Sequence, residues 1–519
     1  MTTRRDLLKF ATAAAGAGAG LATLSGPFIQ GVAAQETPKA GGTLNVGVQG
    51  EIKVLDPNIT TLAAYQSTLR FTLFETLVEV DESLQYVPNL ADSWQFAEDG
   101  LSLTVTLAKG VKFHNGKDFT SQDVAFTVKR LQDPGLDSQW KPQVASVAAV
   151  ETPDDSTAVF RFSAPTPAFL ENLLNVQILT EQGIDQVDTH PVGTGPFEFV
   201  EWVLNDHITL KKFASYRQEG LPYLDELVFR PLLDPDTRLT NIQAGSVGVV
   251  EQPSPKDAER IQADANLTLL VTPATSKYDN FQINCTADAT KNPKVRQALS
   301  FAFDRDTYVN DILYGFGKPA VGPFSETSWA YDAAIIEPYL VFDLDKAKQL
   351  LDEAGQEDGN RLSKLEIMTP KGFDEIKSAA VLLQANLSTI GVDASITELE
   401  LAGWIDRLVT KPDYEITTDT YGYGDTDPAT VLSRDNFAPD TNVHLFRNDE
   451  YKALVEKGAT TPNQDERKQI YSQIQRLMMD QMPGFLIAHR SDLFVTRKTV
   501  HGFNPGPLIR HHYTKVWTE

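Results

Sequence analysis

Cysteine is nearly absent from this sequence: Cys285 is the single one among 519 residues. One thiol excludes an intramolecular disulfide, so the stability of the fold has to come from the burial of apolar side chains. Basic residues are also scarce, since 46 Lys and Arg stand against 70 Asp and Glu, for a net charge of −24. This acidity argues against nucleic acid or anionic lipid as a partner, because both are bound through basic patches. We interpret Cys285 as a small buried hydrophobe rather than a nucleophile.

Catalytic motifs are missing as well. There is no G-x-S-x-G motif, and the nearest run, Ala244–Gly248, begins with alanine. The 8 histidines are scattered without an H-E-x-x-H pattern, so no metal site is predicted. The run PVGTGPFEFV at 191–200 has neither the spacing nor the lysine of a phosphate-binding loop. The sequence therefore predicts no enzyme and no cofactor. A secreted hydrolase stays as the alternative from another class, without a nucleophile to assign.

The N-terminal residues predict an export signal. Arg4 and Arg5 form a twin-arginine pattern, an Ala- and Gly-rich apolar stretch runs from Phe10 to about Leu24, and Val32–Ala34 offers small residues for signal peptidase. That stretch is too short for a membrane anchor, and no later segment approaches the roughly 18 uncharged apolar residues that a spanning helix needs. We therefore predict a twin-arginine signal peptide at 1–34 and a periplasmic protein of two or three domains.

The clearest local pattern lies at residues 89–134. Apolar and polar side chains alternate along Leu101–Leu107, which is typical of a half-buried strand. Thr120 and Asp123 then form a capping pair for a helix. Its apolar stripe consists of Val124, Val128 and Leu131. A hairpin is predicted at 144–162, and we expect these elements to form a small subdomain of their own.

The second half of the chain predicts alternating helices and strands. Helices are expected at 342–354, 373–390 and 463–482, and strands at 364–369, 392–399 and 414–420. Such alternation favours an α/β sheet with helices on its faces. Another helix begins at Asn292-Pro293, and we interpret Arg296 and Arg305 as structural ion-pairing residues. Nearer the N-terminus, apolar positions at helical spacing predict a helix within Ala64–Val80.

Several runs, in this order, resemble the family 5 extracellular solute-binding proteins, the oligopeptide and dipeptide receptors of bacterial ABC importers: LADSW, GVKFHNG, DVAFTVKR, GTGPF, KVRQAL and ANLSTIGVDASITELEL. The resemblance covers nearly all of the chain after the signal. It implies the α/β fold of a type II periplasmic binding protein, with two lobes, a hinge and an extra small, cluster C-like subdomain. The implied ranges are lobe I at 35–80 and 191–272, the extra subdomain at 81–190, lobe II at 273–489, and a return to lobe I at 490–519.

The best candidate for a binding site follows the strand at 414–420. Tyr421, Gly422, Tyr423 and Asp425 stand at the carboxyl end of that strand, where ligands of open α/β sheets gather. Glycine lets the backbone approach a ligand, tyrosine adds broad apolar contact, and a carboxylate can pair with an amine. The alternative is a turn-rich loop that uses Gly and Asp for its backbone shape.

The remaining site candidates depend more on the resemblance. In the family, the loop that matches 60–65 lies at the ligand cleft, which implies a ligand contact for Tyr65. Trp329 and Trp404 are secondary candidates for lining the cleft, with packing in the core as the alternative.

The resemblance implies a periplasmic receptor that binds di- or oligopeptides between its lobes and delivers them to a membrane permease. Aligned on Pro428, the aspartate that binds the peptide α-amine in many of these receptors falls on Gly424, and Asp425 is one residue away. This departure leaves open a non-peptide ligand, such as an opine, an oligosaccharide, glutathione or a chelated metal. The expected partners are the ligand and the permease, with no nucleic acid, and the expected state is a monomer. A periplasmic chaperone or chemoreceptor partner of the same fold is a further alternative.

Overall fold

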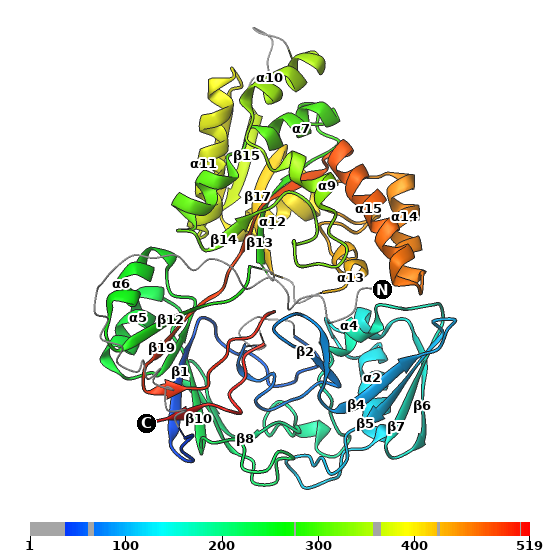
Figure 1. The fold of residues 1–519 in the computed structure, drawn as a ribbon, viewed down its shortest axis with the longest axis vertical. Helices are drawn as coiled ribbons and strands as arrows, with labels where there is room; N and C mark the ends of the chain where they lie inside the picture. Colours follow the sequence, from blue (N-terminus) through cyan, green and yellow to red (C-terminus); the bar gives the residue numbers. More distant parts are fainter. Residues whose placement is uncertain (1–36, 61–66, 275–276, 357–364, 423–425, 509) are drawn as a thin grey trace, which may run out of the picture. The chain divides into compact units, whose positions relative to one another are not determined.

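The computed structural model describes residues 37–60, 67–274, 277–356, 365–422, 426–508 and 510–519. The predicted signal peptide, and the candidates Tyr65, Tyr423 and Asp425, lie outside these residues. Lys39–Glu519 forms one unit, in which three larger sheets each have their own cluster of buried apolar side chains (Figure 1). Among the described residues, no helix has the length and hydrophobicity needed to cross a bilayer.

A seven-stranded mixed sheet contains the first strand and one of the last strands. Its order is β12-β19-β11-β1-β10-β9-β8, and β1 runs parallel to both β10 and β11. Helices α5 (Pro235–Ala244) and α6 (Ala258–Ala263) connect its strands. The strands are β1 (Thr43–Val48), β8 (Phe197–Val203), β9 (His207–Lys212), β10 (Glu226–Pro231), β11 (Val249–Glu251), β12 (Leu267–Val271) and β19 (Leu493–Arg497).

A four-stranded antiparallel sheet, in the order β4-β5-β7-β6, is built from contiguous sequence. Its strands are β4 (Ala91–Phe96), β5 (Ser102–Leu107), β6 (Val147–Asp154) and β7 (Thr157–Phe162), preceded by the pair β2 (Val78–Val80) and β3 (Tyr86–Pro88). The predicted alternation is confirmed for Leu103, Val105 and Leu107, which are buried while the threonines between them are exposed. It is wrong for its first two residues, since the strand begins only at Ser102, Leu101 is 40% exposed and Ser102 is buried. The predicted cap is also confirmed, because the Thr120 N–H donates to Asp123 Oδ2 at 2.9 Å before α2 (Ser121–Gln132).

A six-stranded sheet forms most of the second half, in the order β14-β18-β13-β17-β15-β16. Strands β15, β16 and β17 run parallel, so their carboxyl ends meet at one edge. The strands are β13 (Lys277–Ile283), β14 (Gly317–Pro319), β15 (Leu365–Pro370), β16 (Ala394–Leu399), β17 (Ile416–Gly422) and β18 (Gly484–Arg490). The longer helices are α7 (Pro293–Phe301), α10 (Leu344–Glu353), α11 (Asp374–Thr389), α14 (Asp449–Thr460) and α15 (Gln464–Gln481), so the predicted α/β alternation is confirmed (Figure 1).

The chain passes twice between the seven-stranded and the six-stranded sheet, after β12 and after β18. The two passages are bonded to each other. The Thr272 N–H donates to the Asp492 carbonyl, and the Asp492 N–H donates to Thr272 Oγ1, both at 2.9 Å. Lys277 Nζ lies 2.7 Å from Asp492 Oδ1, and this carboxylate is buried. The passages therefore form a paired connection, the geometry of a hinge.

The helix predicted within Ala64–Val80 is wrong for the described part of that segment. From residue 67 onward only two residues are helical, and Phe71 has a positive φ of 63°. The apolar spacing was misleading because the leucines are buried although the backbone that carries them is irregular. The Thr72 carbonyl accepts from the Phe197 N–H, and the Leu73 carbonyl accepts from the Gly195 N–H. A Cβ on Gly195 would lie 2.3 Å from the Thr72 carbonyl oxygen. The glycines of GTGPF therefore permit close backbone packing.

Two arginines and the cysteine of the second half of the chain have surroundings that bear on their predicted roles. Arg296 and Arg305 are buried and structural. Within the described parts of the chain, however, they donate to carbonyl and hydroxyl oxygens, such as Met482 O for Arg296 and Ala320 O for Arg305, and not to carboxylates. Cys285 is partly buried, and burial raises the pKa of its thiol to about 11. At neutral pH that thiol is protonated and a poor nucleophile.

Candidate ligand-binding site

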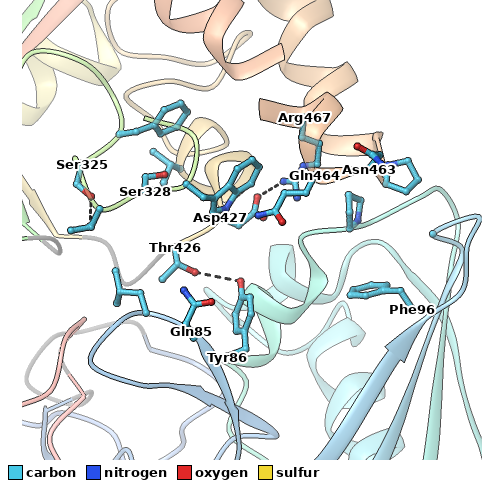
Figure 2. A pocket seen from close by; sticks show the side chains of 18 of the residues that line it. Gln85, Tyr86, Phe96, Ser325, Ser328, Thr426, Asp427, Asn463, Gln464 and Arg467 are labelled. Carbon is cyan, nitrogen blue, oxygen red and sulfur yellow. Dashed lines mark hydrogen bonds and ion pairs between the residues drawn. The ribbon is translucent and has the colours of Figure 1, made fainter. Parts of the chain in front are cut away.

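A cavity of about 710 Å³ lies between segments that adjoin two different sheets. One wall comes from the β2–β3 turn, the β4–β5 turn and Pro167, all close in sequence to the four-stranded sheet. The other wall comes from segment 323–329, from the start of α13 (Pro428–Leu432) and from the start of α15 (Figure 2). The volume falls within the range of about 300–1,000 Å³ found for small-ligand pockets.

The walls of this cavity offer mainly apolar and aromatic surface. Tyr86 and Phe96 lie on the first wall, and Phe324 and Trp329 lie on the second. Flat aromatic faces bury a large area of a ligand at little cost in conformational entropy. Polar side chains at the rim, including Gln85 and Asn463 to Gln464, can orient a bound molecule through hydrogen bonds (Figure 2).

The second wall contains a buried ion pair. Arg467 Nη2 lies 2.5 Å from Asp427 Oδ1, and the two side chains are 5% and 8% exposed. Burial lowers the pKa of Arg467, but the charge of Asp427, the nearby Tyr471 and the hydrogen bonds to both together outweigh burial, and the pKa is raised. The guanidinium also lies 5.1 Å from the ring centroid of Trp329 and donates to the Gly458 carbonyl. Each charge is thus largely neutralised within the wall, and the pair fixes the indole at the cavity.

A second buried carboxylate joins the two walls. Glu171, in α4 (Phe169–Leu173), is fully buried and accepts the Tyr86 hydroxyl at 2.9 Å. The same oxygen accepts the Thr426 hydroxyl and, at 3.2 Å, the Asp427 N–H. In Figure 2, Thr426 and Tyr86 point toward each other across the cavity. The hydroxyl groups of Tyr86 and Thr426, 340 residues apart in sequence, therefore converge on one oxygen.

The residues predicted after the strand at 414–420 are only partly described. Tyr421 is half-buried and stacks on Tyr278, with ring centroids 5.9 Å apart and planes inclined by 16°. Gly422 is exposed and ends β17, and Thr426 is the next described residue. Asp419, two residues before Tyr421, is 8% exposed, and burial raises its pKa to about 7. These residues precede the cavity wall, which contains Thr426 and Asp427.

The two predicted tryptophans have different surroundings. Trp329 lies in the cavity wall and is partly buried against Tyr471. Trp404 is 6% exposed and packs with Met368, Leu408 and other apolar side chains, and its Nε1 donates to Thr417 Oγ1 at 2.7 Å. Core packing accounts for the position of Trp404, and its contact with a ligand stays a prediction.

Several residues of this cavity were not foreseen from the sequence. Tyr86, Phe96 and Arg467 gave no local pattern that indicates a binding role. Asp427 likewise gave no pattern that indicates a binding role. Glu171 had one usable signal, since a lone acid inside the apolar run FLENLL is costly to bury without donors. Among the described residues, no three His, Cys, Asp or Glu side chains are grouped so as to hold a metal ion.

Comparisons with known proteins agree with this architecture. Residues 85–462 match the family described as bacterial extracellular solute-binding proteins, family 5. The chain is 27% identical to the dipeptide-binding protein of Escherichia coli over 91% of this chain and 94% of the relative. It is 30% identical to heme-binding protein A of Haemophilus influenzae over 84% of this chain and 85% of the relative.

A solved structure gives the same result for the fold. The ABC transporter-associated periplasmic binding protein DppA of Helicobacter pylori, in complex with the peptide STSA, is 26% identical to this chain. It superposes with a TM-score of 0.76 over 93% of this chain and 99% of that protein. The predicted type II periplasmic-binding-protein fold, with two lobes and an extra subdomain, is therefore confirmed. The chain belongs to the bacterial extracellular solute-binding proteins of family 5.

Proposed function

We propose that this protein is the ligand-binding receptor of a bacterial ABC importer and that it encloses a short peptide in the cavity between its lobes. The observation that carries the proposal is the cavity of about 710 Å³, with aromatic side chains on both walls. A peptide fits such a site because its side chains can pack on the aromatic faces, while its main chain bonds to the polar groups at the rim. The relatives from E. coli and H. pylori, described as binding a dipeptide and the peptide STSA, support this ligand class.

The proposal includes the cellular setting. The protein acts in the periplasm as a monomer without catalysis, after export through the twin-arginine signal at 1–34. It hands its ligand to the permease of the importer. The residue ranges proposed for the lobes are those stated above. These ranges are supported by the residues that form the seven-stranded, the four-stranded and the six-stranded sheet. Tyr421, Gly422, Tyr423, Asp425 and Tyr65 are proposed ligand contacts at the edge of the cleft, with Trp329 and Trp404 as further contacts.

Calorimetry and thermal shift with a panel of di- to pentapeptides test the ligand class. Binding at micromolar affinity, about −8 kcal/mol, is expected for at least one member. Trp329→Ala should weaken that binding about 10-fold, because it removes an aromatic face from the cavity wall. Trp202→Ala is the matched control, since this half-buried indole belongs to β8 and does not line the cavity. No heat and no thermal shift with any peptide would refute the peptide assignment.

A non-peptide ligand is the second candidate. The observation that favours it is the charge pairing in the cavity wall, where Asp427 is already bonded to Arg467 and is not free for an α-amine. The family's amine-binding position also falls on Gly424. The relative described as a heme-binding protein supports this alternative. Native mass spectrometry of the protein purified under mild conditions separates the candidates, because the mass of the bound molecule identifies a peptide, an opine, an oligosaccharide, glutathione or a chelated metal.

A further inference from the structure

The carboxylate of Glu171 lies in an unusual place for an acid. Its neighbours in α4, Phe169, Leu170 and Leu173, are all buried, and its own side chain has no exposed surface. An ionised carboxylate is costly to remove from water unless donors replace the lost hydration. The local sequence of α4 offers apolar packing instead of donors, so the partners of this carboxylate have to come from other segments.

Three donors to this carboxylate come from both sides of the cavity. Tyr86 belongs to β3 and donates from the same side as Glu171. The Thr426 hydroxyl and the Asp427 N–H donate from the opposite side, which belongs to lobe II. All three donors meet Glu171 Oε2. Hydrogen bonds to an ionised acceptor are among the stronger ones in proteins, so the interlobe bonds are well suited to hold the two walls together.

The contact continues into the cavity wall. Asp427 binds Glu171 through its main chain and Arg467 through its side chain. Arg467 in turn lies against the ring of Trp329. Asp427 Oδ1 also caps α13 by accepting the Ala429 N–H at 2.9 Å. A continuous path of contacts therefore leads from Glu171 to the aromatic surface that faces a ligand.

We propose that Glu171 is a positioning residue, and that Glu171, Tyr86, Thr426 and Asp427 form an interlobe latch that holds the receptor in its ligand-enclosing form. Opening of the lobes breaks the bonds to Thr426 and Asp427 and leaves the carboxylate with Tyr86 among these donors. The latch thus adds to the stability of the closed form with or without a ligand. This inference deepens the proposed function, because it names a residue, Glu171, that sets affinity although it does not line the cavity.

Weakening the latch shifts the equilibrium toward the open form. The apparent affinity for any ligand then falls in proportion to the lost population of the closed form. Glu171→Gln keeps the shape of the side chain but removes its charge, and Thr426→Val removes one lobe II donor at nearly constant volume. We expect each variant to weaken binding of the peptide STSA about 10-fold, chiefly through a faster dissociation rate. Because both variants disturb the same latch, the double variant should lose much less than the product of the two single effects.

The direct test needs no ligand. Hydrogen exchange at single-residue resolution is measured at the Asp427 amide, which bonds across the cavity, and at the Ala429 amide, which bonds within lobe II. Glu171→Gln should speed exchange at Asp427 about 10-fold and leave Ala429 unchanged. Glu98→Gln is the matched control, because Glu98 lines the same cavity from the same side but is exposed.

The outcomes separate the latch from the proposed function. Unchanged exchange at Asp427 in both Glu171→Gln and Thr426→Val would overturn the latch, even if peptides bind. Faster exchange at Asp427 alone supports the latch, even if the wild-type protein binds no peptide, in which case the proposed function fails. If Glu171→Gln does not fold, Thr426→Val and Tyr86→Phe give the same test. An equal effect of Glu98→Gln would also overturn the latch, because that change leaves its bonds intact.

Discussion

Removal of Arg467 should reveal how strongly the buried pair in the cavity wall depends on both of its members. The side chains of Arg467 and Asp427 are 5% and 8% exposed and lie 2.5 Å apart. Arg467→Met keeps the length and the packing of the side chain but leaves the Asp427 carboxylate without its counter-ion. Loss of one partner of a buried pair costs about 3–5 kcal/mol in the free energy of unfolding.

The double variant isolates the charge effect. In Arg467→Met with Asp427→Asn neither charge is left uncompensated, and replacement of a whole buried pair costs little. The Gly458 carbonyl, a second acceptor of Arg467, keeps the Tyr471 hydroxyl as a donor at 3.0 Å. We therefore expect the double variant to lose only about 1–2 kcal/mol, less than the single variant.

Guanidinium denaturation followed by tryptophan fluorescence and by circular dichroism measures these differences. Arg161→Met is the control, because the side chains of Arg161 and Glu151 are 49% and 54% exposed and so exposed an ion pair should contribute little to stability. A loss below about 1 kcal/mol for Arg467→Met would refute the reasoning. So would a double variant whose loss equals the sum of the single losses, because the two charges would then act independently.

Three further predictions concern other buried groups. The pKa of the Asp419 carboxyl is about 4 in the unfolded chain, and burial raises it to about 7 in the folded protein. The free energy of unfolding should therefore fall as pH rises between these values, by up to about 4 kcal/mol. Asp419→Asn should abolish this part of the pH dependence of unfolding. Lys277→Met should cost about 2–4 kcal/mol in denaturation, because the buried Asp492 carboxylate loses the ammonium group that lies 2.7 Å from its Oδ1. Gly195→Ala should cost more than about 3 kcal/mol in the same assay, because its Cβ would lie 2.3 Å from the Thr72 carbonyl oxygen.

Each of these predictions has its own control. The stability of Asp419→Asn should match the wild type more closely at pH 5 than at pH 8, and the opposite order would contradict the assigned sign. Lys294→Met removes an exposed pair with Glu353 and should have little effect on stability. Gly403→Ala adds a methyl group in open space within α12 (Leu401–Ile405), so it should stabilise by about 0.5–1 kcal/mol. Equal losses for both glycine variants would contradict the packing argument.

The sequence predicted those parts of the fold whose signals are local. The alternation along Leu103–Leu107 and the cap at Thr120 depend on neighbours within a few residues, and both occur as expected. The helical spacing of Leu69, Leu73 and Leu77 failed because it reports burial but not the backbone that achieves it. That backbone is fixed by strands and turns about 120 residues further along the chain, which a local pattern does not contain.

The candidate site was predictable to a smaller extent for the same reason. Trp329 was found because an aromatic residue in a loop is a signal in itself, and it lines the cavity. Arg467 and Glu171 sit on helices whose local patterns show only burial, and their role arises from partners 40 and 256 residues away. A buried charge can be recognised in a sequence, but its partner becomes visible only when the fold brings the two together.

The position of β19 in the seven-stranded sheet has a consequence for the synthesis of the protein. This strand, Leu493–Arg497, lies between β11 and β12, so the sheet that begins with Thr43 is incomplete until residues 493–497 have been synthesised. The four-stranded sheet, by contrast, uses only residues 91–162 and can form early in translation. A nascent chain therefore holds an unfilled gap between β11 and β12 from the synthesis of residue 271 until that of residue 493. The synthesis of β19, rather than any earlier step, sets the earliest time at which the seven-stranded sheet closes.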